Sequence, residues 1–407
     1  MFQPSLSTFN SEMLSRLLSR QPRLVALLQT LFWTLLFVLI ADVTINLTLS
    51  MPKDPKVKPE GLTNYFDYGR SVEGKLRHSL GTSDENASPL SAAGWLDRDC
   101  QRSIAEVPQH RVISFFGMSF SNDVAIALQA LDRTFTPVLF AGPAAPPNHS
   151  YRCFLLQQNY AEHNGRDGSE IQVLGLLASS VKGLLSMTGA TTGFEGAAPF
   201  TYPRYEIDAS GSLQETLPLI GSADDWRKSL VNPALRQALL AQLSKKDIFF
   251  DPILFNASWA DSSAILRMLR RGYAQSRSRD LAESVMGANG YLERPEVGPV
   301  LKAIVLDFAA RSRAAGKRPV VLLLQDGQSG NALFRLLSGT LEKDAVEYVS
   351  THSIAPTSDS SNFIGDGHFT AAANKRIAEK LHDLLISGGP ETPFFEKSIP
   401  LEYKRDL

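Results

Sequence analysis

The sequence predicts an α/β fold with a mostly parallel sheet, preceded by one apolar helix near the N-terminus. Two observations support this fold: short apolar runs alternate with helical stretches from Arg111 onward, and an uncharged apolar run occupies residues 24–41. The short apolar runs are VISFF, EIQVLG, DIFFDPILF and PVVLLL, and residues 299–315 have the spacing of a helix. Strands that alternate with helices in this way form βα units around a parallel sheet.

The composition is that of a globular protein with a sizeable core. The chain has 407 residues, of which 43% are hydrophobic and 20% charged, and its net charge is -1. This length suits two domains or one large α/β domain. The balanced charge excludes binding to nucleic acid through a generally basic surface. Its histidines and cysteines match no metal-ligand spacing, so we expect no metal and no cofactor.

The uncharged run, LVALLQTLFWTLLFVLIA, continues past Asp42 as VTINLTL. Because about 20 apolar residues in a helix cross a hydrocarbon core of ~30 Å, we expect a transmembrane helix over residues 24–47. A cleaved signal peptide fits less well, since its apolar region is about 7–15 residues long and ends in a small-x-small site. A buried core helix is the other alternative. The lipid bilayer is therefore an expected partner of residues 24–47.

The orientation of this helix in the membrane is predicted from the positive charges that flank it, and these are equal in number on the two sides. Three arginines precede the run and three lysines follow it: Arg16, Arg20 and Arg23, then Lys53, Lys56 and Lys58. The count itself is a tie, but two of the arginines lie closer to the span. We therefore expect residues 1–23 to be cytoplasmic and the C-terminal domain to be extracytoplasmic.

The rest of the chain divides into three expected parts. Residues 48–105 are a juxtamembrane spacer that begins with a Pro/Lys stretch, includes a surface helix over residues 62–78 and ends in loop. Residues 106–388 form the α/β domain, and residues 389–407 form a C-terminal tail. Cys100 and Cys153 are the two cysteines. In an extracytoplasmic domain they could form a disulfide, and two buried free thiols are the alternative.

A first candidate for catalytic chemistry lies in VISFFGMSFSND, residues 112–123. A predicted strand leads into Gly117 and Ser119, and a helical stretch follows. A serine at such a turn can expose its hydroxyl at the carboxyl edge of the sheet, where helix N-terminal N–H groups favour a developing oxyanion. The alternative is that Ser119 simply caps the helix.

A second candidate lies in FIGDGHFTAAANKRIAEKLHDLL, residues 363–385. Asp366 and His368 stand in a glycine-containing loop before an amphipathic helix. A histidine is suited to accept a proton from serine near neutral pH, and a carboxylate on its other ring nitrogen fixes the tautomer. Two ordinary exposed side chains at a helix start are the alternative.

Together the two segments resemble the SGNH, or GDSL-like, hydrolase family over residues 106–388. GMSFS is similar to the family's GDS motif, and DGH is similar to its DxxH motif. The resemblance implies a three-layer αβα sandwich in which Ser119 is the nucleophile, His368 the base and Asp366 its orienting acid. It also implies an oxyanion hole formed by Gly175 or Ala178, in the second block, and by Asn256, in the third block LFNASWADS.

The sequence departs from the family pattern at four places. Met118 replaces the aspartate of GDS, and the glycine of the second block is either Ala178 or shifted onto Gly175. The third block lacks a clean GxND, and one residue instead of two separates Asp366 from His368. Each departure leaves a serine–histidine–aspartate triad chemically possible. Together they also allow an inactive relative that keeps the fold.

The resemblance implies a carbohydrate O-acyl esterase or O-acyltransferase anchored in the inner membrane of a bacterium, with its domain in the periplasm. Its expected substrate is an O-acetylated or otherwise O-acylated polysaccharide of the cell envelope. Expected partners are this polymer and membrane proteins of acyl transfer or export, with no nucleic acid. The alternative is a non-catalytic subunit that uses the same cleft to bind polysaccharide or a membrane partner.

Overall fold

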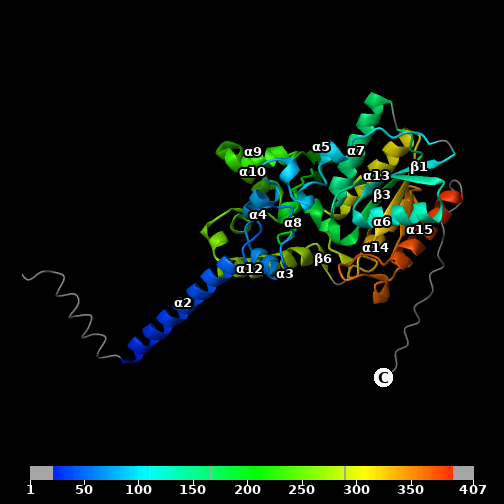
Figure 1. Cartoon of the computed structure of the whole chain (residues 1–407). Helices are drawn as coiled ribbons and strands as arrows, with labels where there is room; N and C mark the ends of the chain where they lie inside the picture. Colours follow the sequence, from blue (N-terminus) through cyan, green and yellow to red (C-terminus); the bar gives the residue numbers. More distant parts are fainter. Residues whose placement is uncertain (1–21, 108, 166, 288–289, 388–407) are drawn as a thin grey trace, which may run out of the picture.

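A computed structural model describes residues 22–107, 109–165, 167–287 and 290–387. The predicted tail and all but the last two residues of the predicted cytoplasmic segment lie outside these ranges. Figure 1 shows a long helix, α2 (Pro22–Thr48), that projects from a larger globular part. In the part of the chain that the structure describes, α2 is the one helix long and apolar enough to cross a membrane. An N-terminal apolar helix is thus confirmed.

The central sheet is parallel throughout, which confirms the predicted α/β class. Its five strands lie in the order β2-β1-β3-β8-β9. They are β1 (Arg111–Gly117), β2 (Phe135–Ala141), β3 (Ile171–Leu177), β8 (Arg318–Leu324) and β9 (Glu347–Ser350). In such a doubly wound sheet the chain runs outward in opposite directions from β1 and β3. Ligands of these sheets bind at this switch point, beyond the carboxyl ends of the strands.

Helices cover both faces of the sheet (Figure 1). Helices α6 (Ser119–Leu131) and α15 (Ala371–Ile386) pack on one face, where Ile113 and Phe115 of β1 point. Val112 and Phe116 point to the opposite face, which carries α7 (Pro147–Asn164), α13 (Gly298–Ala314) and α14 (Ala332–Lys343). Because alternate residues of each strand are buried on alternate faces, the inner strands are mostly apolar, with Ser114 and Gln172 as buried polar exceptions.

A third apolar core organises a lobe beside the sheet. It combines Leu76 and Trp95 with Trp226 and Phe255. Its helices are α3 (Gly61–Asp67), α4 (Val72–Ser79), α5 (Leu96–Asp99), α8 (Gly189–Thr192), α9 (Ala223–Val231), α10 (Pro233–Lys246), α11 (Pro252–Phe255) and α12 (Ala264–Glu283). Residues 62–105, expected as a surface helix and loop of the spacer, thus contribute buried side chains to this core.

Short elements connect these parts. They are the strand pairs β4 (Arg204–Ile207) with β5 (Leu213–Thr216) and β6 (Met286–Gly287) with β7 (Gly290–Tyr291), and the 3₁₀ turns η1 (Asp84–Asn86), η2 (Pro89–Ser91), η3 (Ala178–Leu185), η4 (Trp259–Ser262) and η5 (Ser360–Asn362). The apolar run at residues 247–255, predicted as a strand, instead ends in the short helix α11. Asp251 accepts hydrogen bonds from the N–H groups of Ile253 and Leu254, which begins a helix after this residue.

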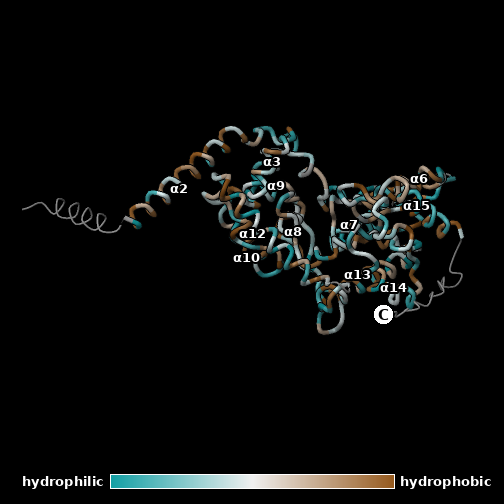
Figure 2. The backbone as a smooth tube through the Cα atoms, turned by 90° about the horizontal axis from the view of Figure 1, so that it is seen from below, coloured by the Kyte–Doolittle hydropathy of each residue, from teal (hydrophilic) through white to brown (hydrophobic). Residues whose placement is uncertain are grey.

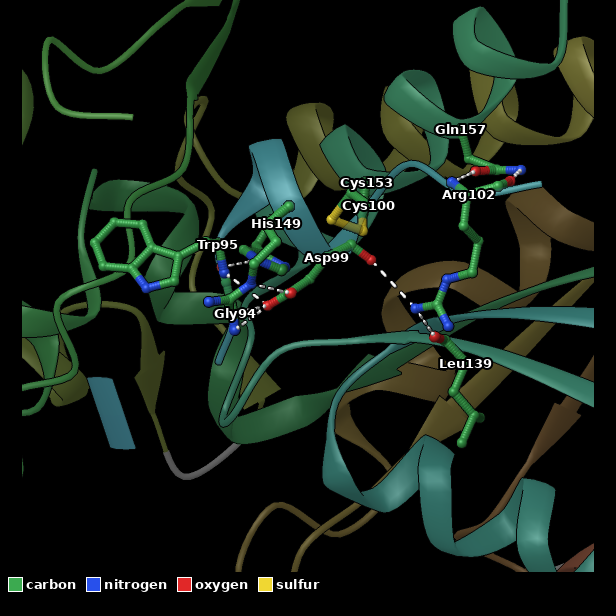
Figure 3. The surroundings of a disulfide bond; sticks show 10 residues. Gly94, Trp95, Asp99, Cys100, Arg102, Leu139, His149, Cys153 and Gln157 are labelled. Atoms are coloured by element: carbon green, nitrogen blue, oxygen red, sulfur yellow. Dashed lines mark hydrogen bonds and ion pairs between the residues drawn. A yellow bond between two sulfur atoms is a disulfide. The ribbon is translucent and has the colours of Figure 1, made fainter. Parts of the chain in front are cut away.

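A disulfide joins Cys100 and Cys153, whose Cα atoms lie 4.8 Å apart (Figure 3). It ties the segment before the first strand to the middle of α7. One turn earlier on α7, buried His149 places Nε2 2.9 Å from Gly94 O, and because a carbonyl only accepts, this nitrogen donates. Burial lowers the pKa of His149 to about 4. His149 therefore acts as a neutral packing residue.

Candidate active site

Ser119 lies at the carboxyl end of β1, where the chain turns directly into α6. It is the first residue of α6, and Met118 before it has the extended conformation of an N-cap. The first hydrogen bond of the helix runs from Asn122 N–H to Met118 O. The Ser119 hydroxyl is therefore not the helix cap, and it points to another partner. The N–H groups of the first turn have no acceptor within the helix.

Met118 is fully buried in the core between β1 and α6. Its sulfur lies 3.6 Å from the Ser121 hydroxyl, which donates to it. This apolar environment gives a physical reason for the absence of an aspartate: a carboxylate here would lose its water without gaining a cationic partner. The packing beneath the turn thus explains why position 118, an aspartate in the GDS motif, is a methionine here.

His368 reaches Ser119 from a tight loop that precedes α15. Phe363 and Phe369 pair as an isolated antiparallel bridge, and Ile364 N–H donates to His368 O at 2.8 Å. Gly367 at the tip has φ +91°, a left-handed conformation that a residue with a side chain adopts only under strain. The glycine therefore allows a turn short enough to carry Asp366 and His368 side by side.

The three predicted catalytic side chains form one hydrogen-bonded chain. Ser119 Oγ lies 2.7 Å from His368 Nε2, and His368 Nδ1 lies 3.1 Å from Asp366 Oδ1. The same carboxylate oxygen accepts the backbone N–H of His368 at 3.1 Å. Because a carboxylate fixes the proton on Nδ1, Nε2 is left free to accept the serine proton. The single-residue spacing of Asp366 and His368 is thus compatible with the triad.

Hydrogen bonds from His368 favour the charged form of Asp366. Its backbone N–H, and then its side chain, lower the pKa of the Asp366 carboxyl below its ordinary value. The side chain of Asp366 is 64% exposed and that of His368 is 28% exposed. His368 is therefore partly exposed and Asp366 largely exposed at the surface.

Phe120 packs against the imidazole of His368. The sequence motifs did not indicate a role for Phe120. Its ring stacks on His368 with centroids 4.4 Å apart and planes 18° apart. Phe369 meets Phe120 edge-on at 5.4 Å. The signal available in the sequence was an aromatic residue directly after both the serine and the histidine. These rings restrict the rotation of His368 about its side-chain bonds.

Gly175 and Ala178, the expected backbone donors of the second block, lie at and near the carboxyl end of β3. Gly175 is inside the strand, opposite Leu322 of β8. A Cβ atom at this position would collide with the Ser121 hydroxyl, so glycine permits the close approach of α6 to the sheet. Ala178 is the first residue after β3, and its carbonyl accepts the Tyr291 hydroxyl at 2.8 Å.

The loop after β3 is fixed by the loop after its neighbour β8. Asp326 Oδ2 accepts the backbone N–H of Ser179 at 3.1 Å, and its other oxygen accepts the N–H groups of Gln328 and Ser329. Burial lowers the pKa of nearby Lys182. The contact between Asp326 and Ser179, at the carboxyl edge of the sheet, was not predicted from the sequence, because the two residues follow different strands.

Asn256 does not join the triad, so its expected role in the oxyanion hole is corrected. It caps the end of α11 in the neighbouring lobe, and its Oδ1 accepts a hydrogen bond from Arg236 at 3.0 Å. The same arginine pairs with Glu73, which also accepts the N–H of Ala257. In Figure 1 these helices, α10 and α4, lie away from α6 and α15. LFNASWADS therefore resembles a third block in sequence only, because the structure does not place Asn256 beside Ser119 and His368.

Among the described residues, no group of three or more histidine, cysteine, aspartate or glutamate side chains is arranged to hold a metal ion. The site at the edge of the sheet consists instead of a serine, a histidine and a carboxylate. In comparisons with known proteins, the chain matches no protein-family model, and no curated protein matches its sequence. What this site does is therefore inferred from its own geometry.

Proposed function

We propose that this chain is a membrane-anchored serine hydrolase of SGNH type that cleaves or transfers acyl esters. The observation that carries the proposal is the unbroken chain from Ser119 Oγ through His368 to Asp366 at the switch point of a parallel sheet. The three-layer arrangement of helices and sheet supports the same family, and the α2 helix supports the anchor.

The geometry leads to a two-step acyl transfer. Ser119 Oγ attacks the ester carbonyl while His368 Nε2 takes the serine proton, and the ionised Asp366 stabilises the resulting imidazolium. First-turn N–H groups of α6, together with the backbone after β3 near Ala178, stabilise the oxyanion. His368 returns the proton to the leaving alcohol. Water then releases the acyl group in an esterase, and a sugar hydroxyl accepts it in an O-acyltransferase.

The exposure of the site favours a large substrate. Because His368 and Asp366 are open to solvent, an acyl group carried on a polymer can approach without entering a closed cavity. We propose an O-acetylated polysaccharide of the cell envelope or an exported polysaccharide as substrate. The proposed location is the bacterial inner membrane, with the domain in the periplasm beside membrane proteins of acyl transfer or export.

A non-catalytic role is the second candidate, and the position of Asn256 favours it. In a hydrolase of this family, a side-chain amide donor would complete the oxyanion hole, and here Asn256 lies in the neighbouring lobe, where its Oδ1 accepts a hydrogen bond from Arg236. In this case the same surface would bind acylated polymer or a membrane partner without cleaving it.

The two candidates are separated by a pair of alanine variants. Ser119→Ala and His368→Ala should each lower hydrolysis of p-nitrophenyl acetate by about 10³-fold or more, and the double variant should be no slower, because the residues act as one unit. Ser119→Ala should also lose labelling by a fluorophosphonate. The controls Ser210→Ala and His163→Ala replace exposed residues outside the triad. Labelling and hydrolysis that Ser119→Ala retains in full would show that Ser119 is not the nucleophile. Absence of both in the unmodified protein would leave the binding role as the function.

A further inference from the structure

The membrane helix is fixed to the globular domain instead of being tethered by a flexible segment. Asp42 Oδ1 accepts hydrogen bonds from the Ser263 hydroxyl and the Ile265 N–H, both at 2.9 Å, at the start of α12. One turn later, Asn46 Oδ1 accepts from Arg267 at 3.0 Å. Since α2 is continuous to Thr48, its direction relative to the domain is set by these contacts.

These contacts also place the bilayer surface. Within the candidate span Arg23–Thr48, the uncharged part ends at Ala41, because Asp42 is hydrogen-bonded to polar groups of the domain. The uncharged run 24–41 measures roughly 27 Å at about 1.5 Å per residue, which is close to the ~30 Å of a hydrocarbon core. No segment of chain separates the end of this run from the first contact with the domain, so nothing holds the domain away from the membrane. The surface around Asp42 must therefore lie at the level of the lipid headgroups.

That surface carries a group of exposed apolar side chains, which we call the apolar collar. Its members come from the end of α2, from α3, from η4 and from α12: Leu47, Leu62, Tyr65, Trp259 and Leu269. Trp259 is 79% exposed and Leu269 is 66% exposed. Figures 1 and 2 both place α3 and α12 next to the point where α2 joins the domain.

Hydrogen bonds and a ring contact join the elements that carry the collar around this point. Arg267, which binds Asn46 of α2, also donates to Phe66 O of α3 at 2.8 Å. Arg271, one turn further along α12, stacks over the ring of Tyr65. Trp259 lies in the turn that leads directly to Ser263. The collar residues are thus displayed by elements that are linked to α2 itself.

The chemistry of the collar matches a lipid interface. Large exposed apolar groups that gather at one place mark a binding surface, and tryptophan and tyrosine are favoured at the depth of the headgroups. Three exposed lysines, Lys53, Lys56 and Lys58, lie in the segment between α2 and α3. Lysines at a membrane surface are attracted to anionic headgroups.

We propose that the apolar collar inserts into the leaflet from which α2 emerges, so that the domain lies on the membrane in one fixed orientation. This inference rests on the proposed membrane span of α2. It adds a second membrane contact, made by the domain itself, and it holds the catalytic edge of the sheet at a constant height above the lipid.

Spin labels in the full-length protein test this proposal. Single-cysteine variants Leu62→Cys, Trp259→Cys and Leu269→Cys carry a nitroxide in nanodiscs of phosphatidylcholine and phosphatidylglycerol, and the native disulfide leaves no competing thiol. Val231→Cys and Ile126→Cys are controls, because these apolar residues are exposed elsewhere on the domain. Leu35→Cys is the reference within the span. The measured quantity is the ratio of accessibility to oxygen over accessibility to a water-soluble nickel complex.

We expect the ratio at the three collar positions to be at least threefold above both controls and below that at Leu35. Collar ratios equal to those of the controls, with a high ratio at Leu35, would overturn the collar and leave the span intact. An aqueous ratio at Leu35 as well would overturn both the span and the collar. Collar labels shielded from both reagents and broadened by each other would show a second copy on this surface, which also contradicts lipid insertion.

Discussion

Local hydrogen bonds stabilise the ionised form of the Asp366 carboxylate, and this affects how the expected activity depends on pH. Its pKa lies below the ordinary 3.8, first because the backbone N–H of His368 binds it and second because the His368 side chain does. A lowered pKa means that this stabilising contact is present above pH 3.8 and is lost as the pH falls through the lowered value. Mild acidification therefore leaves Asp366 ionised.

We expect a carbon NMR titration of the Asp366 carboxyl group to have its midpoint below 3.8. In His368→Ala the midpoint should rise only in part, because the variant keeps the backbone N–H that contributes most. Asp359, whose pKa is lowered by Ser361, is an internal control that His368→Ala should leave unchanged. A midpoint for Asp366 at or above 3.8 in the unmodified protein would contradict the hydrogen bonds described.

Phe120 is expected to act on catalysis through the orientation of His368. An aromatic stack contributes about 0.5–1.5 kcal/mol beyond the burial of its area, and 1.36 kcal/mol corresponds to a tenfold rate. Phe120→Leu keeps an apolar side chain and should lower kcat/KM for an acyl ester by up to about tenfold. Phe115→Leu is the matched control, since Phe115 is buried in the same core. Equal losses in both variants would mean that Phe120 serves packing alone.

At the scale of elements, the junction of β1 and α6 depends on an apolar residue at position 118. Because Met118 is fully buried, Met118→Asp would place an uncompensated charge in the core and should lower the free energy of unfolding by roughly 3–5 kcal/mol. Met118→Leu conserves the volume and should change it by less than about 1.5 kcal/mol. Urea denaturation of both variants gives the comparison. An aspartate variant as stable as the leucine variant would show that this site admits water.

The elements that were predicted correctly carry a strong local pattern. Strands β1, β3 and β8 are mostly apolar runs buried on both faces, and α13 and α15 show helical spacing of their buried residues. The edge strand β2 was missed because Pro137 interrupts it and much of it is only half-buried. The triad could be found because each part carries a local signal. Phe120 and the true position of Asn256 depend on tertiary packing, which motif order does not specify.

At the scale of the whole molecule, the disulfide is expected to be a main stabilising link. It closes a loop with a sequence separation of 53, for which chain entropy gives about 4 kcal/mol. Cys100→Ser with Cys153→Ser should therefore lower the free energy of unfolding by up to about 4 kcal/mol, measured by urea denaturation. Adding a reductant to the unmodified protein should produce a similar loss. A denaturation midpoint that neither treatment changes would exclude a stabilising role for this link.

The wide separation of Ser119 and His368 along the chain has a consequence for biosynthesis. The two residues are 249 positions apart, and His368 lies just before the last helix of the described domain. At about 5–20 residues per second, the ribosome needs roughly 12–50 s to proceed from the serine to the histidine. A nascent or truncated chain that stops before this position therefore has the serine without the histidine. In the proposed mechanism, acyl transfer can begin only after the chain has been made beyond His368, so shorter products should be inactive.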